Sequence, residues 1–185
     1  LSVRSKPLVA KALPIVPEDT AESLVTDIQR SIAQQDYAVA MEKLTKLKTF
    51  GELDKANREL ALQTYLGGAQ QIANSDASLA SSYYAQAGQL YLLKEQTYAA
   101  FENFKKATDL DEANDQAMEE MLVLQKEISD KYHREASSAF RRQELDLAIE
   151  KWNMVLKVNP DHSSAKLYRA QALELKEKLQ NLNQS

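Results

Sequence analysis

The sequence predicts an all-α protein, and three observations lead to that prediction. Only 4 glycines and 4 prolines occur among the 185 residues, and three of the prolines precede Asp19. No proline interrupts the chain between Glu18 and Asn159, so long helices are permitted over almost the whole length. Apolar residues recur at spacings of three and four, as on one face of an α-helix. We therefore expect an antiparallel array of about eight helices in a single domain, residues 18–185.

Composition places the chain among globular proteins and excludes several kinds of site. Hydrophobic residues make up 44% and charged residues 27% of the chain. Because the chain has 0 cysteines, disulfides and thiolate metal sites are excluded. No run of 18 apolar residues is present, so no membrane span is expected. The chain begins with Leu1 rather than Met, and we expect it to be a fragment or a processed product.

Residues 1–17 form a segment of distinct composition. They contain three prolines, several large apolar residues and three basic residues without an acidic one. Proline favours extended backbone, so an extended basic arm is expected, either as a linker or packed on the helical body or on a neighbouring copy. The net charge of −4, less +3 for the arm, leaves −7 on residues 18–185. An acidic body is a poor surface for phosphate backbones, so nucleic acid is not an expected partner.

The first three helices are delimited by polar residues and turns. The first is expected to begin near Asp19 or Thr20, which are suitable N-caps, and to end at residues 34–36. The second follows over 36–50 and the third over about 54–74. The glycines at 67 and 68 lie inside the third helix, where close contact with another helix is the main interpretation and a functional hinge the alternative.

Two further helices, about 77–94 and 97–110, carry a pair of spaced patterns. The first pattern, aromatic-x2-small-Gly-x2-Tyr, comprises Tyr84, Ala87, Gly88 and Tyr91. The second pattern, A-x3-F-x2-A, comprises Ala100, Phe104 and Ala107. Small residues at such positions let two antiparallel helices approach closely, while the aromatic rings fill the surrounding layer. These patterns resemble the tetratricopeptide repeat family, although Glu112 stands where that family usually has proline.

A long helix of around 28 residues is expected over 115–142, because no helix breaker interrupts its apolar stripe. The clearest repeat covers 81–114, and a second recognisable pattern covers 129–162 and ends with the expected Pro160. Its offset of 48 residues exceeds the 34-residue period by 14, which is about four helical turns. The long helix accounts for this extra length, and the next helix, about 145–158, packs back on it. Residues 20–50 fit the family only as a degenerate repeat.

The last helix, about 161–182, has two interpretations. Its apolar residues alternate by three and four like a heptad seam, and they are Ala165, Tyr168, Ala172, Leu175, Leu179 and Leu182. Terminal repeats need a capping helix, so this helix is expected to cover the last repeat. The alternative is a self-association seam, since the end of the helix projects beyond that repeat.

No catalytic constellation is found in the sequence. His133 and His162 are the only histidines, neither has a second ligand three or four residues away, and His133 is expected at the surface. There is no Gly-rich phosphate loop, and the acidic run 109–115 lacks the glycine of a calcium loop. We therefore expect no enzyme activity, no cofactor and no metal.

The resemblance implies an interaction scaffold, because stacked helix pairs in that family bind peptides or partner helices on a concave face. By position, the matching residues here are Ser82, Ala85, Gln89, Leu92 and Leu93 on the clear repeat, and Asp130, His133, Ser137, Phe140 and Arg141 on the second. The Lys, Asn and Arg clamp of chaperone-binding members is absent at these positions. The composition resembles tetratricopeptide modules of bacterial envelope proteins, which predicts a periplasmic or envelope location, with the cytoplasm as alternative. A homo-oligomer using residues 1–17 and 161–182, or a subunit that recruits substrate to an enzyme, are the other hypotheses.

Overall fold

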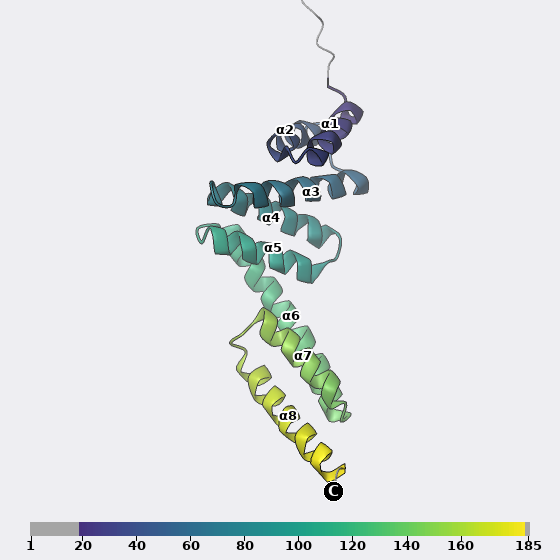
Figure 1. The fold of residues 1–185 in the computed structure, drawn as a ribbon, viewed down its shortest axis with the longest axis vertical. Coiled ribbons are helices and arrows are strands. Elements are labelled where there is room, and N and C mark those ends of the chain that lie inside the picture. Colours follow the sequence, from purple (N-terminus) through teal and green to yellow (C-terminus); the bar gives the residue numbers. More distant parts are fainter. Residues whose placement is uncertain (1–18, 184–185) are drawn as a thin grey trace, which may run out of the picture.

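The computed structural model describes residues 19–183, and this part of the chain consists of eight α-helices joined by short turns (Figure 1). In chain order they are α1 (Ala21–Ala33), α2 (Tyr37–Lys48), α3 (Lys55–Ile72), α4 (Ala77–Leu93), α5 (Thr97–Leu110), α6 (Asp115–Arg141), α7 (Leu145–Val158) and α8 (Ser163–Asn183). No strand occurs among residues 19–183, so the predicted all-α class with about eight helices is confirmed. The predicted basic arm, residues 1–17, lies outside the described residues.

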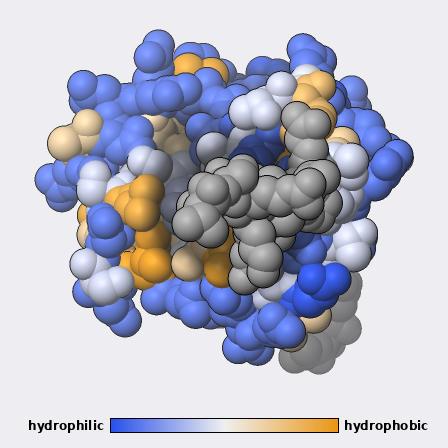
Figure 2. Space-filling model, turned by 90° about the horizontal axis from the view of Figure 1, so that it is seen from above, coloured by the Kyte–Doolittle hydropathy of each residue, from blue (hydrophilic) through white to orange (hydrophobic). Residues whose placement is uncertain are grey.

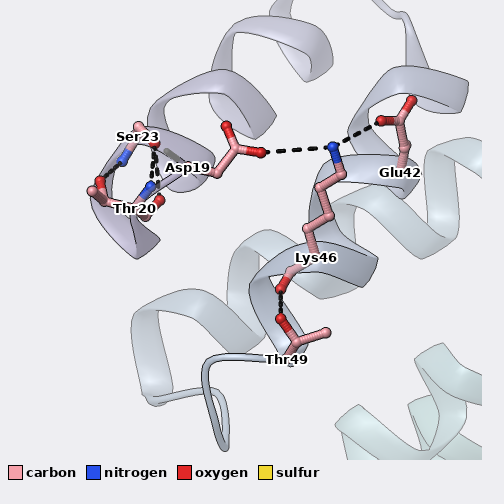
Figure 3. Close-up of polar contacts among 6 residues, drawn as sticks. All are labelled: Asp19, Thr20, Ser23, Glu42, Lys46 and Thr49. Atoms are coloured by element: carbon pink, nitrogen blue, oxygen red, sulfur yellow. Dashed lines mark hydrogen bonds and ion pairs between the residues drawn. The ribbon is translucent and has the colours of Figure 1, made fainter. Parts of the chain in front are cut away.

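Short polar side chains fix the starts of five helices. At each start the residue before the helix accepts a hydrogen bond from a backbone N–H group of the first turn, and these residues are Thr20, Asp36, Asp54, Asp76 and Asn114. The cap of α1 is reciprocal: Ser23 N–H donates to Thr20 Oγ1 at 3.1 Å, and Thr20 N–H donates to Ser23 Oγ at 2.9 Å (Figure 3). Each such cap contributes about 1 kcal/mol, so the sequence itself sets where these helices begin.

An exposed ion-pair network joins the start of α1 to α2. The Lys46 ammonium lies 3.3 Å from the Glu42 carboxylate and 3.6 Å from the Asp19 carboxylate (Figure 3). Hydrogen bonding to Glu42 and the charge of Asp19 raise the pKa of Lys46. Pairs of this kind are screened by water and salt, so the network orients the first helix rather than holding the fold together.

The turns that close the hairpins α1–α2, α4–α5 and α6–α7 share one conformation. In each turn one residue has a positive φ, and these are Gln35 (58°), Glu95 (56°) and Gln143 (63°). The N–H group of the following residue donates to the carbonyl group five positions earlier, in the pairs Asp36–Ser31, Gln96–Tyr91 and Glu144–Ala139. This bond with a left-handed residue before it is the Schellman motif of helix C-termini. Residues 19–183 thus contain three hairpins closed by the same turn.

The helices are stacked along one long axis (Figure 1). The α1–α2 hairpin lies at one end, followed by α3 and the α4–α5 hairpin, and α6 runs from α5 to the other end, where α7 and α8 pack. Three apolar clusters follow each other along the described part of the stack, within α1–α4, within α4–α6 with Val158 at the end of α7, and within α6–α8. Seen from the α1–α2 end, the surface is mainly hydrophilic, with small separate apolar areas (Figure 2).

The predicted long helix is confirmed as α6, whose 27 residues span about 40 Å. Its first half packs on α5 through Ala117, Leu124 and Ile128. Its second half packs on α7 and α8 through Ala136 and Ala139. The change of neighbour occurs near Gln125, whose side-chain amide donates to the Val158 carbonyl at the end of α7 (3.0 Å).

Two glycines lie where helices approach too closely for a side chain. A Cβ atom at Gly88 would be 2.9 Å from the ring of Phe104, between α4 and α5. At Gly67 it would be 2.0 Å from the ring of Tyr37 on α2, which supports the close-contact interpretation of this position. Ala87, Gly88, Ala100, Phe104 and Ala107, which carry the resemblance to tetratricopeptide repeats, are all buried.

Candidate protein-interaction surface

The outer side of α4 carries uncharged polar residues and exposed leucines, Leu79 near its start and Leu93 at its end. Ser82, Gln86 and Leu93 are exposed and Gln89 is half-buried, at spacings of three and four that place them on one side of the helix. Leu93 is 62% exposed. No charged residue occurs anywhere in α4. This side of α4 can therefore make apolar and hydrogen-bonding contacts without first separating an ion pair.

The first half of α6 lies beside this side of α4. The Gln89 side-chain amide donates to the Glu120 carboxylate at 3.1 Å and joins the two helices. Helical spacing places Gln116, Val123 and Glu127 on the same side of α6 as Glu120, and all three are exposed, Val123 to 57%. We define the α4–α6 surface by its eight residues: Ser82, Gln86, Gln89, Leu93, Gln116, Glu120, Val123 and Glu127.

Buried polar contacts fix α6 relative to α4. The Ser81 hydroxyl is buried, donates to the Ala107 carbonyl at 2.8 Å and accepts from the Asn114 amide at 2.9 Å. Asn114 also caps α6, so one side chain both starts the helix and ties it to α4. Ser78 adds a hydrogen bond to the Asp111 carboxylate at 2.8 Å. The surface is therefore built on two helices held in a fixed relation.

Two open hollows flank the α4–α5 turn at the end of this surface. The larger, about 820 Å³, lies between the start of α3 and the end of α4, and Leu93 forms part of its lining. The ion pair between Lys94 and Glu59 (2.7 Å) is formed by two of its lining residues. The second, about 450 Å³, lies between the start of α5 and the middle of α6 and is lined in part by Glu127 and Tyr132. Glu95, in the turn, lines both hollows.

The structure separates the five residues predicted on α4 into two groups. Ser82, Gln89 and Leu93 lie on the α4–α6 surface. Ala85 and Leu92 are half-buried and pack against the apolar cluster of α4–α6, so they face the neighbouring helices more than solvent. The prediction for α4 thus named residues of two adjoining sides of one helix.

The residues predicted on the long helix lie in its second half, away from α4. Arg141 is exposed, and the half-buried Ser137 donates its hydroxyl to the His133 carbonyl at 2.8 Å. The ring of Phe140 lies 5.7 Å from that of Trp152 on α7. The expectation that His133 is a surface residue is wrong, because its ring is half-buried against α7 and α8 and accepts a hydrogen bond from Trp152 Nε1 at 3.3 Å. Its role is in the packing of three helices.

The residues of α6 that lie beside α4 were missed by the sequence prediction. They are Gln116, Glu120, Val123 and Glu127, in the first half of α6. Stepping 34 residues from Ser82, Gln86, Gln89 and Leu93 leads to these four positions. The 48-residue offset, which fits the α6–α7 hairpin, led instead to the second half of the helix. The 34-residue offset was therefore the sequence signal that could have identified these four residues of α6.

An aromatic cluster holds α8 against the α6–α7 hairpin. The rings of Trp152 and Tyr168 are stacked with 5.9 Å between centroids, and the His133 ring lies 5.1 Å from that of His162. His162 Nδ1 accepts the backbone N–H of Ala165 at 3.2 Å, which ties the start of α8 to this imidazole. Burial, with a smaller effect of His162, lowers the pKa of His133, although Asp130 opposes the shift. His162 is half-buried in the same cluster.

Comparison with known proteins gives one kind of match. No protein-family model matches the chain, and no curated protein matches it. Among solved structures, the TPR2AB-domain:pHSP90-complex of yeast Sti1 is similar at a TM-score of 0.37 and 15% identity, over 83% of this chain and 70% of that one.

The part of the chain that the structure describes has neither a metal-binding cluster nor a membrane-spanning helix. Among residues 19–183, no group of three or more His, Cys, Asp or Glu side chains is placed to hold a metal ion. None of the helices described is both long and apolar enough to cross a membrane.

Proposed function

We propose that this chain is a non-catalytic protein-interaction scaffold whose α4–α6 surface binds a peptide segment or a partner helix. The observation that carries the proposal is that two helices joined by the Gln89–Glu120 hydrogen bond each leave a large apolar side chain, Leu93 and Val123, uncovered. Exposed apolar groups bordered by polar residues are typical of sites for partner proteins. Amphipathic helices bind to apolar surfaces between helices through apolar residues at helical spacing.

The chemistry of the surface restricts its partner. None of its eight residues is basic, whereas Glu120 and Glu127 are acidic. A peptide that ends in acidic side chains and a free carboxylate would find no cation to pair with here. The uncharged side of α4 instead offers amide and hydroxyl groups at Ser82, Gln86 and Gln89. We therefore favour a partner that presents apolar residues together with amide or basic groups.

A crosslinking pull-down from the native host tests the proposal with paired variants. Leu93→Glu/Val123→Glu places two charges on the α4–α6 surface and is expected to abolish capture of a stoichiometric partner. Leu122→Glu is the matched control, because Leu122 is a neighbouring exposed residue of α6 on a different side of the helix. Both variants should melt as the wild type does, since the altered side chains are exposed. An unchanged partner set in the double variant would overturn the proposal.

The proposal extends to a place in a larger bacterial envelope assembly, with a cytoplasmic one as alternative. Its support is the resemblance in composition described for the Ala-, Gln- and Ser-rich helices and the basic arm. Fractionation of the native host, followed by detection of the chain, tests this part separately. Recovery with the cytoplasmic proteins alone would contradict the envelope assignment and leave the interaction surface unaffected.

A further inference from the structure

Helix α8 is held to the rest of the molecule along one side only. Ala165 and Ala172 are its two fully buried residues, and both belong to the apolar cluster of α6–α8. On the same side, the Arg169 guanidinium donates to the Asn153 side chain, and Lys176 pairs with Asp146. These small residues and polar contacts, together with the stacking of Tyr168 on Trp152, form the attachment, whereas the leucines of α8 make no part of it.

The leucines in the second half of α8 form a stripe that no described helix covers. Leu175, Leu179 and Leu182 share one side of the helix by their spacings of four and three. All three are exposed, Leu175 to 38%, Leu179 to 44% and Leu182 to 73%. The predicted heptad seam of α8 therefore contains two sets of residues. Its alanines pack on the rest of the molecule, whereas its leucines are exposed.

The position of α7 explains why the exposure increases along the stripe. Lys176 of α8 pairs with Asp146, which lies in the first turn of α7. Because the two helices are antiparallel, residues after Lys176 extend past the start of α7. Figure 1 shows the end of α8 projecting beyond the α6–α7 turn. Leu179 and Leu182 thus lie where the hairpin offers nothing to pack against.

We propose that this stripe pairs with the same stripe of a second copy of the chain, as two antiparallel α8 helices related by a two-fold axis near residue 177. In such an interface each surface faces its own equivalent. This axis places Leu175 of each copy opposite Leu179 of the other, and Leu182 of each copy at the end of the seam, level with residue 172 of the other copy. Two exposed helical faces then form one apolar seam of the kind found in coiled coils.

The charges beside the stripe favour a second copy over an unrelated partner. Glu174 and Lys178 lie along its outer border and form an ion pair of 2.6 Å within α8. One acid and one base make the border neutral, so it attracts neither an acidic nor a basic partner. Antiparallel pairing brings Lys178 of each copy within reach of Glu174 of the other, which makes the border complementary to itself. Charged pairs of this kind determine which partner binds and in which orientation, and they contribute less to the affinity of the complex.

The paired α8 helices would leave the α4–α6 surface open. None of the eight residues that define that surface lies on α7 or α8. The proposed pairing of α8 helices therefore does not depend on what the α4–α6 surface binds. A dimer joined at α8 would carry two copies of the α4–α6 surface, which would raise the apparent affinity for a partner that displays two binding segments.

Sedimentation analysis of residues 1–185 over a range of concentrations tests the pairing. The expected result is a mass that rises with concentration from the chain mass of 20.8 kDa towards twice that value. Leu175→Glu/Leu179→Glu should keep the protein at the chain mass, and so should Leu182→Glu, whose side chain is too exposed to affect folding. Leu173→Glu is the control, because Leu173 is also exposed but lies on another side of α8. A wild type that stays at the chain mass throughout, or a dimer that survives the stripe variants, would overturn the proposal.

Cysteine crosslinking tests the direction of pairing, which is practical because the chain has 0 cysteines. Lys178→Cys should form a disulfide-linked dimer under mild oxidation, since residue 178 lies next to the proposed axis. At residue 182 the two equivalent positions would be about 15 Å apart along the helices, too far for a disulfide. Crosslinking of Leu182→Cys but not of Lys178→Cys would contradict the antiparallel arrangement.

Discussion

The two halves of α6 differ in what covers them. The first half contacts α5 through its apolar side and α4 through Glu120, and the rest of its circumference, including Val123, is exposed. The second half packs with α7 and α8 around Trp152. One continuous helix therefore takes part in two different packing units.

This difference between the two halves of α6 explains why corresponding residues of successive repeats are separated by two different numbers of residues. From α4 to the first half of α6 the step is the ordinary 34 residues, whereas from the α4–α5 hairpin to the α6–α7 hairpin it is 48. Adding about four turns inside a helix moves the next hairpin along its axis without a loop. The added turns also leave part of α6 without a covering helix, and the α4–α6 surface includes this part.

Removing the largest buried side chain of the second half should give the largest effect. Trp152 is 1% exposed, and Trp152→Ala is expected to lower the free energy of unfolding by about 3–5 kcal/mol. Native-state hydrogen exchange should then show faster exchange in α7, α8 and the second half of α6, with α1–α5 little changed. Phe104→Ala is the counterpart in the first unit. Equal acceleration along the whole chain in both variants would show that α6 makes the molecule one cooperative unit.

A smaller loss is expected at the point where α6 changes its neighbour. Gln125→Leu removes the hydrogen bond to the Val158 carbonyl, and we expect a loss of about 1 kcal/mol in urea unfolding. Lys126→Ala serves as the control, because its pair with Asp130 is exposed and should contribute less than about 0.5 kcal/mol. If both variants had the same stability, Gln125 would not be the junction between the two halves.

A gain in stability is expected from substitutions in the turns that close the helical hairpins. Glu95 has a left-handed backbone with φ of 56°, which glycine adopts without steric cost. Glu95→Gly should therefore raise the free energy of unfolding by about 0.5–1 kcal/mol, and Gln143→Gly should do the same in the second unit. Thermal unfolding measures both, with Glu102→Gly as a control that should destabilise because residue 102 lies inside α5. Unequal gains at 95 and 143 would mean that the two turns are under different constraints.

The smallest effect concerns pH and only the second half of α6. Burial lowers the pKa of His133 below its usual 6.5, so its stabilising contribution is complete above that value. It is lost as pH falls, because the unfolded chain takes up the proton first. Melting temperatures at pH 7.5 and 5.5 should therefore differ less in His133→Gln than in the wild type. A larger pH dependence in the variant would contradict the assigned environment of His133.

Most of the helical order could be predicted from local signals. N-cap residues such as Thr20 and Asn114 mark helix starts, and the absence of breakers after Asp115 predicts one long helix. The close approach at Gly88 followed from the small residues of the repeat pattern. These features depend on a few neighbouring residues, and for that reason the sequence displays them.

The surface was harder to predict because it depends on the relation between distant helices. Which residues of α6 lie beside α4 is fixed by Asn114 bonding to Ser81, a contact 33 positions apart. The sequence allowed two registers for α6, and the more recognisable repeat led to the second half. His133 looked like a surface residue because its neighbours Trp152 and Tyr168 come from later helices.

Site-specific photocrosslinking along α6 tests the central claim most directly. A photoreactive residue would be placed at Gln116 or Val123 in the first half and at Ser137 or Arg141 in the second, in the native host. The account predicts that the first two positions capture the same partner and that the last two do not. Capture at Ser137 and Arg141 alone would contradict it, and would place the working surface on the second half of the helix.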